Sequence, residues 1–135
     1  MDFLKEKSKF NIDSAQCLIE NNLYAPSVHC SYYGSFQFMK HKLKNCRNAT
    51  YGDIEVACLN YKGGTHGYII DNILQELKAT INNNREFAEI KRIIKDLKAF
   101  RIKSDYYDSQ ILNEEAQKSI DYSKEIIQTI KTNIR

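Results

Sequence analysis

The stretch FAEIKRIIKDLKAFRIKSDYYD, residues 87–108, decides the fold of this chain. Its apolar side chains recur every three or four positions, which is the spacing that places them along one face of an α-helix. Asn83 is followed three residues later by Glu86, an arrangement typical of a capping box, so we expect the helix to begin there. Polar residues between 105 and 110 are expected to end it. The predicted apolar face consists of Phe87, Ile90, Ile93, Ile94, Leu97 and Phe100.

The same helical spacing covers most of the remaining chain. Gly34 interrupts one apolar stripe, and because a glycine inside a helix costs about 1 kcal/mol relative to alanine, we expect it to permit a close approach of two helices. Thr65 and Asn113 are the expected caps of the helices that they begin. These further helices are expected over about residues 2–21, from Pro26 to about Leu43, over 65–81 and over 113–135. Residues 50–61 could form a short helix or a loop with one turn, and their apolar spacing favours the short helix.

Composition supports an all-α fold in a single domain. The chain of 135 residues contains only five glycines and one proline, too few for the many turns of an all-β protein. We therefore predict an antiparallel four-helix bundle with an additional short helix in the fifties. A chain of this length suits one domain, residues 1–135.

Charge and cysteines narrow the classes of function. Lys and Arg number 20 against 17 Asp and Glu, and this net charge of +3 permits contact with RNA or nucleotides without arguing for it. The four cysteines have no CxxC spacing, so we expect no metal site and no cofactor, and we expect the cysteines to be mostly small core residues. With no signal peptide and no apolar run of ~18 residues, we expect a cytoplasmic location and no membrane association.

Three histidines are available for acid–base chemistry. His29 shares a helix face with Tyr33, but no nearby residue in the sequence supplies a carboxylate to orient it, so a core or interface position is the favoured interpretation. His41 lies in KHKLK, which is typical of a solvated basic face. His66 lies in GGTHG, where backbone N–H groups at a helix start could hold a phosphate. A flexible connector is the favoured interpretation of that segment because it lacks P-loop spacing.

The end of the quoted stretch is the best candidate site. Arg101 and Asp105 are four residues apart, so they can pair on one helix face. Tyr106 is then expected to pack against the same corner. The structural interpretation is a local ion pair that ends the helix, with Tyr106 as a plug, and exposed pairs of this kind stabilise a fold by only tenths of a kcal/mol.

Three stretches taken together resemble a known family. They are AQCLIENNLYAPSV, HCSYYGSFQFMKHKL and FRIKSDYYDSQILNEEAQKSIDYSKEII, and they include the pair Tyr32-Tyr33 and the corner Arg101-x-Lys103-x-Asp105-Tyr106. This pattern resembles HEPN domains, in particular the stand-alone prokaryotic group with an R-x-K-A-D-Y-like corner. The resemblance covers about residues 10–45 and 97–130.

The resemblance implies a bundle of four to five helices that is often dimeric, with one of two roles. Some members are metal-independent ribonucleases of toxin–antitoxin or defence systems that use an R-x(4–6)-H motif at the dimer interface. Others are partners of a minimal nucleotidyltransferase or bind nucleotides or RNA without catalysis. In this chain Asp105 and Tyr107 stand four and six residues after Arg101, so the histidine of the nuclease motif is absent. Imidazole suits proton transfer near neutral pH, whereas carboxylate or phenol would need pKa shifts of several units.

Three hypotheses remain open. The favoured one is a non-catalytic HEPN-type binding module that forms a homodimer and serves as the partner or substrate-binding subunit of a minimal nucleotidyltransferase. The second is an active ribonuclease that combines Arg101 with a histidine from elsewhere or with Tyr106, and the third is a plain helical interaction module. We assign no catalytic residue and no metal ligand. The predicted family-signature corner, which would contact RNA or a nucleotide, consists of Arg101, Lys103, Asp105, Tyr106, Tyr32, Tyr33 and His29.

Overall fold

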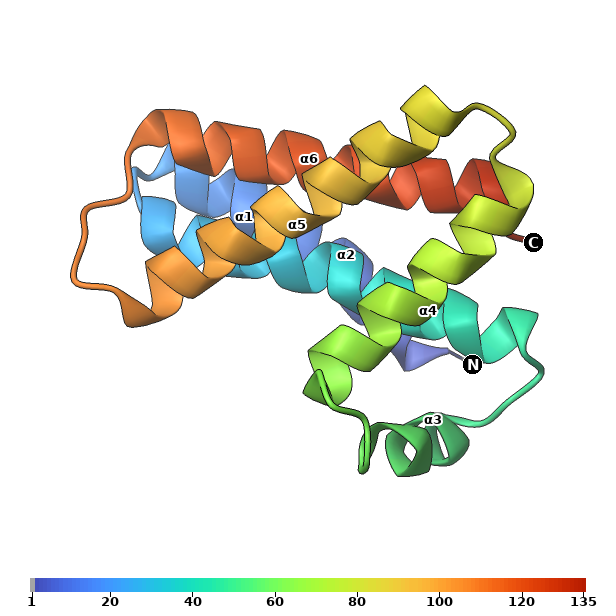
Figure 1. The fold of residues 1–135 in the computed structure, drawn as a ribbon. Helices are drawn as coiled ribbons and strands as arrows, with labels where there is room; N and C mark the ends of the chain where they lie inside the picture. The colour runs from blue at the N-terminus through green and yellow to red at the C-terminus, as the bar shows by residue number, and fades with distance from the viewer. Residues whose placement is uncertain (1) are drawn as a thin grey trace.

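The computed structural model describes residues 2–135, and the chain in this range forms six α-helices and no strand (Figure 1). The predicted all-α class is confirmed. Five helices have 17 residues or more, so the expected number of four long helices is one too low. In chain order the helices are α1 (Phe3–Glu20), α2 (Tyr24–Cys46), α3 (Tyr51–Cys58), α4 (Gly64–Thr80), α5 (Asn84–Tyr106) and α6 (Asn113–Asn133).

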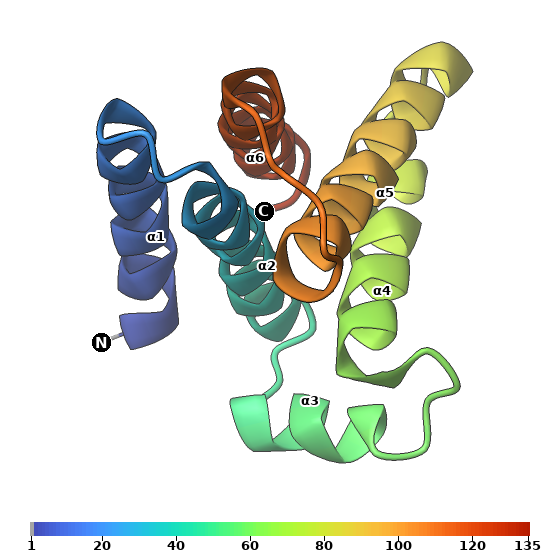
Figure 2. The same ribbon diagram turned by 90° about the vertical axis from the view of Figure 1, so that its left-hand side faces the viewer.

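The central element is α2, which packs against α1, α4, α5 and α6. Figure 2 shows α1 on one side of it and α6, α5 and α4 on the other, and α5 and α4 contact α2 directly. Its buried stripe follows the predicted helical spacing, and each large apolar side chain that is fully buried stabilises the fold by about 1.5–3 kcal/mol. The stripe consists of Val28, Tyr32, Phe36, Met39 and Leu43, all of which are buried.

The close approach that was predicted at Gly34 is confirmed. A Cβ atom built on Gly34 would lie 2.6 Å from Cδ1 of Ile12 on α1. In addition, the Ser8 hydroxyl donates a hydrogen bond of 2.6 Å to the carbonyl of Gly34. The glycine therefore sets the distance between α1 and α2, and Ser8 links the two helices there.

Asp2 fastens the start of α1 to two other helices. Its carboxylate caps α1 by accepting from the backbone N–H groups of Leu4 and Lys5. It also accepts from the Tyr51 hydroxyl at 2.8 Å and lies 2.6 Å from Nδ1 of His41. Partial burial opposes ionisation, but the hydrogen bonds from Tyr51 and His41 outweigh it and hold the pKa of Asp2 well below its ordinary value. His41 is buried, so its assignment to a solvated face was wrong.

Of the three N-cap residues predicted from the sequence, one caps its helix in the structure and two do not. Asn83 accepts from the N–H groups of Arg85 and Glu86, as predicted. At α4, however, the N-cap is Gly63 and no side chain caps the helix, so Thr65 is not a cap. At α6 the N-cap is Leu112, again without a side-chain bond, and Asn113 is the first helical residue. Polar residues near a helix start do not reveal which of them will have the extended backbone that a cap requires.

The four cysteines are free thiols in different environments. Only Cys58 is buried, whereas Cys17 is exposed and Cys30 and Cys46 are intermediate, so the expectation that most are core residues was wrong. Burial raises the pKa of both intermediate thiols. Within residues 2–135, no helix is long and apolar enough to cross a membrane.

Candidate functional site

Arg101 lies in the last turns of α5, with its side chain turned into the bundle. The residue is only 7% exposed. Its guanidinium carbon lies 4.8 Å from the ring centroid of Tyr32 and 5.8 Å from that of Tyr33, both on α2. These are cation–π distances, and their attraction is strongest where water is excluded. The two tyrosines singled out in the sequence thus form the wall against which the arginine packs.

Asp105 joins this arginine to a histidine of α2. The ion pair between Nη1 of Arg101 and Oδ2 of Asp105 was predicted from their spacing, and it is present at 3.8 Å. Both carboxylate oxygens of Asp105 also lie 3.0 Å from Nδ1 of His29. The orienting carboxylate that local sequence did not provide therefore comes from a residue 76 positions away. The side chain of His29 is 48% exposed, so it is not a core histidine.

His66 of α4 belongs to the same corner. The Tyr32 hydroxyl lies 2.7 Å from its Nδ1, and its ring stacks on Phe36 with a centroid distance of 4.4 Å. Burial, together with the positive charges of Arg101 and Lys98, lowers the pKa of His66 to about 4. Burial also raises the pKa of the Tyr32 hydroxyl well above its ordinary value. A protonated phenol and a neutral imidazole thus share an uncharged hydrogen bond of 2.7 Å between the Tyr32 hydroxyl and Nδ1 of His66.

The remaining predicted residues lie at the rim of the corner. Tyr106 is 73% exposed, so the prediction that it plugs the corner was wrong, although its ring centroid lies 5.9 Å from the guanidinium carbon of Arg101. Lys103 instead faces α6, where its Nζ lies 2.9 Å from Oε2 of Glu115. Tyr33 packs between His29 and Tyr32, with ring centroid distances of 4.7 and 5.2 Å.

His66 is the residue of this corner that the sequence prediction missed. Its segment, GGTHG, was assigned to a flexible connector because it lacks P-loop spacing. Its position is nevertheless four residues before Ile70 and seven before Ile73, which continues the buried stripe of α4 backwards by one turn. Extending that periodicity would have placed His66 on the inner face of the helix.

The geometry limits what the corner can do chemically. The guanidinium is shielded by aromatic rings, and its Nε is buried with no hydrogen-bond partner within the described chain. A carboxylate rather than an imidazole faces it from within α5. In the part of the chain that the structure covers, no cluster of three or more His, Cys, Asp or Glu could hold a metal ion. The accessible groups are His29, the rim of Asp105 and the exposed tyrosines Tyr106 and Tyr107.

Comparison with known proteins gives one finding of similarity. The family model of the HEPN domain matches residues 56–133, which is more than half of the chain. The match runs from α3 to α6 and contains Arg101, Lys103, Asp105 and Tyr106, but not His29, Tyr32 and Tyr33 of α2. It includes a segment outside the sequence resemblance, from 56 to 96, and does not extend over residues 10–45. No curated protein and no solved structure matches the chain.

Proposed function

Because this chain belongs to the HEPN domain family, we propose that it is a non-catalytic HEPN-type binding module that acts as a homodimer and serves as the partner or substrate-binding subunit of a minimal nucleotidyltransferase. The observation that carries this proposal is the state of Arg101, which is buried under tyrosine rings and faces a carboxylate. To stabilise the phosphate at which RNA is cleaved, a guanidinium must be able to contact that phosphate. Here that group holds the corner together and leaves the outer surface for binding.

The chemistry of RNA cleavage supports the same conclusion. That reaction needs one group to take the proton of the 2′-hydroxyl and another to protonate the leaving oxygen. Within α5 the residue four positions after Arg101 is Asp105, and its carboxylate is already engaged by Arg101 and His29. The exposed tyrosines at the rim, 73% for Tyr106 and 64% for Tyr107, suit a protein interface instead, since tyrosine combines apolar area with a polar tip.

One observation favours a metal-independent ribonuclease as the second candidate. The sequence of α5 lacks the histidine of the R-x(4–6)-H motif, but two histidines from other helices reach the corner. They are His29 of α2 and His66 of α4. His29 is the more accessible of the two, with 48% of its side chain exposed, whereas Nδ1 of His66 is engaged by the Tyr32 hydroxyl and its pKa of about 4 makes it a weak base. A ribonuclease of this kind would belong to a toxin–antitoxin or defence system. Its activity requires that the guanidinium of Arg101 become accessible to RNA, for example in a dimer.

A cleavage assay separates the two candidates. Purified protein is incubated with a labelled RNA pool of mixed sequence, with and without EDTA. The binding module leaves the RNA intact. The ribonuclease cleaves it in EDTA, and cleavage disappears in Arg101→Ala and falls in His29→Ala or His66→Ala, whereas Lys118→Ala on the exposed side of α6 cleaves normally. Cleavage with this pattern would reject the proposal.

A second measurement tests the partner. Light scattering after size exclusion is expected to give twice the mass of one chain. Co-expression with a nucleotidyltransferase encoded beside this gene is expected to yield a stable complex, and incubation with ATP then shows whether Tyr106 or Tyr107 becomes labelled with AMP. A monomer that does not retain the transferase would contradict the proposal.

A further inference from the structure

Two loops at one end of the bundle carry exposed apolar side chains. The α1–α2 turn (21–23) and the α5–α6 loop (107–112) lie together at this end, which is on the left in Figure 1 and faces the viewer in Figure 2. Ile19 before the turn and Ile111 in the loop belong to one buried cluster, and Tyr24 packs against it. Eight large apolar side chains are exposed in residues 2–135, and four of them lie here. We call these four the apolar end patch: Leu23, Tyr106, Tyr107 and Leu112.

Two side chains of the apolar end patch occupy positions where a helix favours a polar residue. Leu23 is the N-cap of α2 and Leu112 is the N-cap of α6, and neither forms a side-chain hydrogen bond to its helix. In contrast, Asp2, Thr50 and Asn83 cap α1, α3 and α5 with their side chains. Leucine is among the poorest N-cap residues. Because the two leucines are 51% and 54% exposed, burial does not compensate for the missing caps, and such uncompensated choices are expected at functional surfaces.

The surface around the apolar end patch carries negative charge. No lysine or arginine occurs in residues 10–39 or 104–117, and these two intervals contain both loops. The exposed carboxylates at this end are Glu20, Asp108 and Glu114, and we call them the acidic border. None of the three forms an ion pair with a residue of the described chain. The end of the bundle is thus negative, although the whole chain has a net charge of +3.

The neighbouring basic side chains do not cancel the acidic border. Arg101 is buried, and Lys103 is engaged at 2.9 Å by Glu115. Lys118 lies one turn further along α6 than Glu114 and forms no ion pair with it. The carboxylates that surround the patch are therefore free to pair with a partner.

This combination of an apolar patch and an acidic border favours one kind of occupant. RNA and anionic membranes are disfavoured, because their phosphates would face unpaired carboxylates. A two-fold dimer through this end would bring the same acidic borders together. A basic protein segment satisfies both features, since its apolar side chains bury the patch and its lysines or arginines pair with the border.

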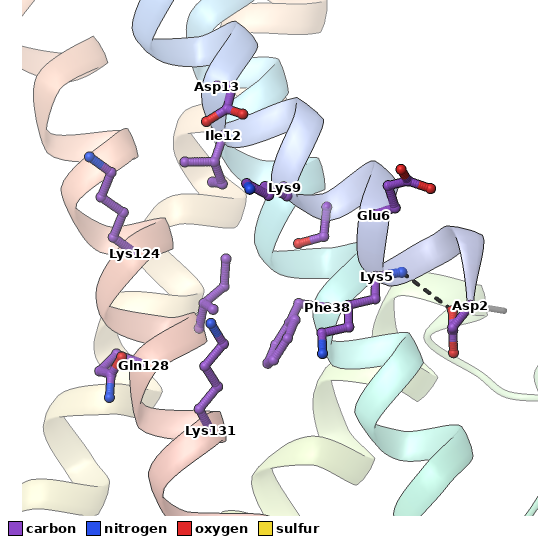
Figure 3. Close-up of a pocket in the computed structure, with 12 residues that line it drawn as sticks. Asp2, Lys5, Glu6, Lys9, Ile12, Asp13, Phe38, Lys124, Gln128 and Lys131 are labelled. Atoms are coloured by element: carbon purple, nitrogen blue, oxygen red, sulfur yellow. Dashed lines mark hydrogen bonds between the residues drawn. The ribbon is translucent and has the colours of Figure 1, made fainter.

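The groove between α1 and α6 offers no such selectivity (Figure 3). Its volume is about 520 Å³, but the charges along its α1 side are mixed, because Lys5 and Lys9 alternate with Asp2, Glu6 and Asp13. A surface of mixed charge does not distinguish a basic partner from an acidic one. The apolar end patch is for this reason the better-defined interaction surface.

We propose that the apolar end patch and its acidic border bind a basic segment of a partner protein. Apolar side chains of that segment pack on Leu23, Tyr107 and Leu112, and its lysines or arginines pair with the carboxylates of the border. This interface rests on the proposed function, which assigns Tyr106 and Tyr107 to contact with a protein, and it adds the charge of that protein's surface.

A displayed library of short peptides tests the chemistry of the partner with the full chain. The peptides carry arginines at fixed positions, with apolar and aromatic residues randomised between them. A matched library has glutamate in place of each arginine. We expect binders only from the arginine library, and their binding should shift the amide NMR signals of the α1–α2 turn and the α5–α6 loop.

Charge reversal of the acidic border provides a second test. The double variant Asp108→Lys/Glu114→Lys is expected to weaken the selected peptides by at least about tenfold, because attraction becomes repulsion. The matched control Glu6→Lys/Glu125→Lys makes the same change in net charge and also replaces one first-turn glutamate, but it leaves the border intact. We expect the control to bind within about twofold of wild type.

The leucine caps allow binding to be separated from stability. Leu23→Ser/Leu112→Ser gives both helices a polar N-cap, so the melting temperature measured by circular dichroism is expected to rise. The same variant removes apolar contact area, so its affinity for the selected peptides is expected to fall by at least about tenfold. A variant that is more stable but binds less would show that the two leucines serve the interface and not the fold.

Four outcomes would overturn the proposal. The arginine library could yield no binder, or only binders that tolerate both loop variants. The glutamate library could yield peptides that bind the same two loops. Leu23→Ser/Leu112→Ser could lower the melting temperature, which would make the leucines structural. Asp108→Lys/Glu114→Lys could convert a dimer to a monomer in size exclusion, which would assign this end to a second copy of the chain.

The proposed function fails by different results. A chain that cleaves RNA in EDTA, or that retains no transferase on co-expression, would reject the non-catalytic partner of a nucleotidyltransferase. The peptide selection and the two loop variants would still decide whether the end of the bundle binds a basic protein segment.

Discussion

At position 101 a guanidinium is held by aromatic faces and by a single long ion pair rather than by hydrogen bonds of its own. Its Nε has no partner among the residues described, and the pair with Asp105 is 3.8 Å long. The charge is thus enclosed without being fully satisfied, which costs free energy unless the surrounding rings compensate for it. Tyr32 and Tyr33 supply that compensation.

Removal of this side chain is expected to destabilise the fold. Arg101→Ala should lower the free energy of unfolding by about 3 kcal/mol, because a buried partner of Asp105 and of the tyrosine rings disappears. Arg101→Lys keeps the charge but loses the planar group that lies against Tyr32, so a smaller loss is expected. Urea denaturation followed by circular dichroism measures both. A loss below about 0.5 kcal/mol for Arg101→Ala would mean that the arginine does not hold the corner.

The depressed pKa of His66 makes stability depend on pH. The pKa lies near 4 in the folded chain and near 6.5 in the unfolded chain, so between these values the unfolded state takes up a proton that the folded state does not. Stability due to His66 is complete above pH 6.5 and is lost as the pH falls towards 4. Because the ring is only half buried, we expect a loss of about 1 kcal/mol between pH 7 and pH 5.

His66→Gln should remove this dependence. The variant leaves every other titratable group in place, so the informative quantity is the difference in stability loss between wild type and variant. Denaturation curves at pH 7 and pH 5 provide it. If wild type and His66→Gln lose equal stability, the histidine is solvated rather than enclosed by Tyr32 and Phe36.

At the scale of helices, α1 and α2 meet at a point where only glycine fits. A Cβ on Gly34 would lie 2.6 and 2.9 Å from the side chain of Ile12, whereas Gly52 in α3 has no neighbour closer than 3.6 Å. We expect Gly34→Val to cost about 3 kcal/mol, because a branched side chain must push the helices apart. Gly52→Ala serves as the control and should gain about 0.5–1 kcal/mol from helix propensity. Thermal melts of the two variants should shift in opposite directions, and a neutral Gly34→Val would contradict the close approach.

Helical periodicity predicted the elements well because their buried faces follow it closely. The stripes of α2, α4 and α5 were found from spacing alone, and so was the pair of Arg101 with Asp105. Caps were less predictable, as Thr65 and Asn113 illustrate, since a cap depends on the backbone conformation of one residue.

Contacts between helices distant in the chain were not predictable. His29 meets Asp105, His66 meets Tyr32 and His41 meets Asp2, and each pair joins residues at least 34 positions apart. Spacing along one helix says which side chains share its face but not which helix covers that face. For this reason His41 and His66 were assigned to environments different from those that the structure gives them, and the carboxylate beside His29 was not predicted.

At the scale of the whole molecule, α2 connects the two parts of the core. One buried cluster contains the inner faces of α4 and α5 and the C-terminal half of the inner face of α6. The other cluster contains the C-terminal end of α1 and the N-terminal end of α6. Side chains of α2 belong to both clusters. With its central helix shared in this way, the bundle should unfold as one unit. We expect a single calorimetric transition with equal calorimetric and van't Hoff enthalpies, as for the one domain predicted from the length. Two resolved transitions would show that the parts melt separately.

The uneven exposure of the four thiols has a practical consequence for spectroscopy. Cys17 is exposed on α1, whereas Cys58 is buried. Burial raises the pKa of the Cys30 and Cys46 thiols, so a smaller fraction of each is the reactive thiolate. A maleimide dye at neutral pH should therefore attach first to α1 without any mutagenesis. Since the chain has no tryptophan to add background emission, that fluorophore would report directly on motions of the first helix.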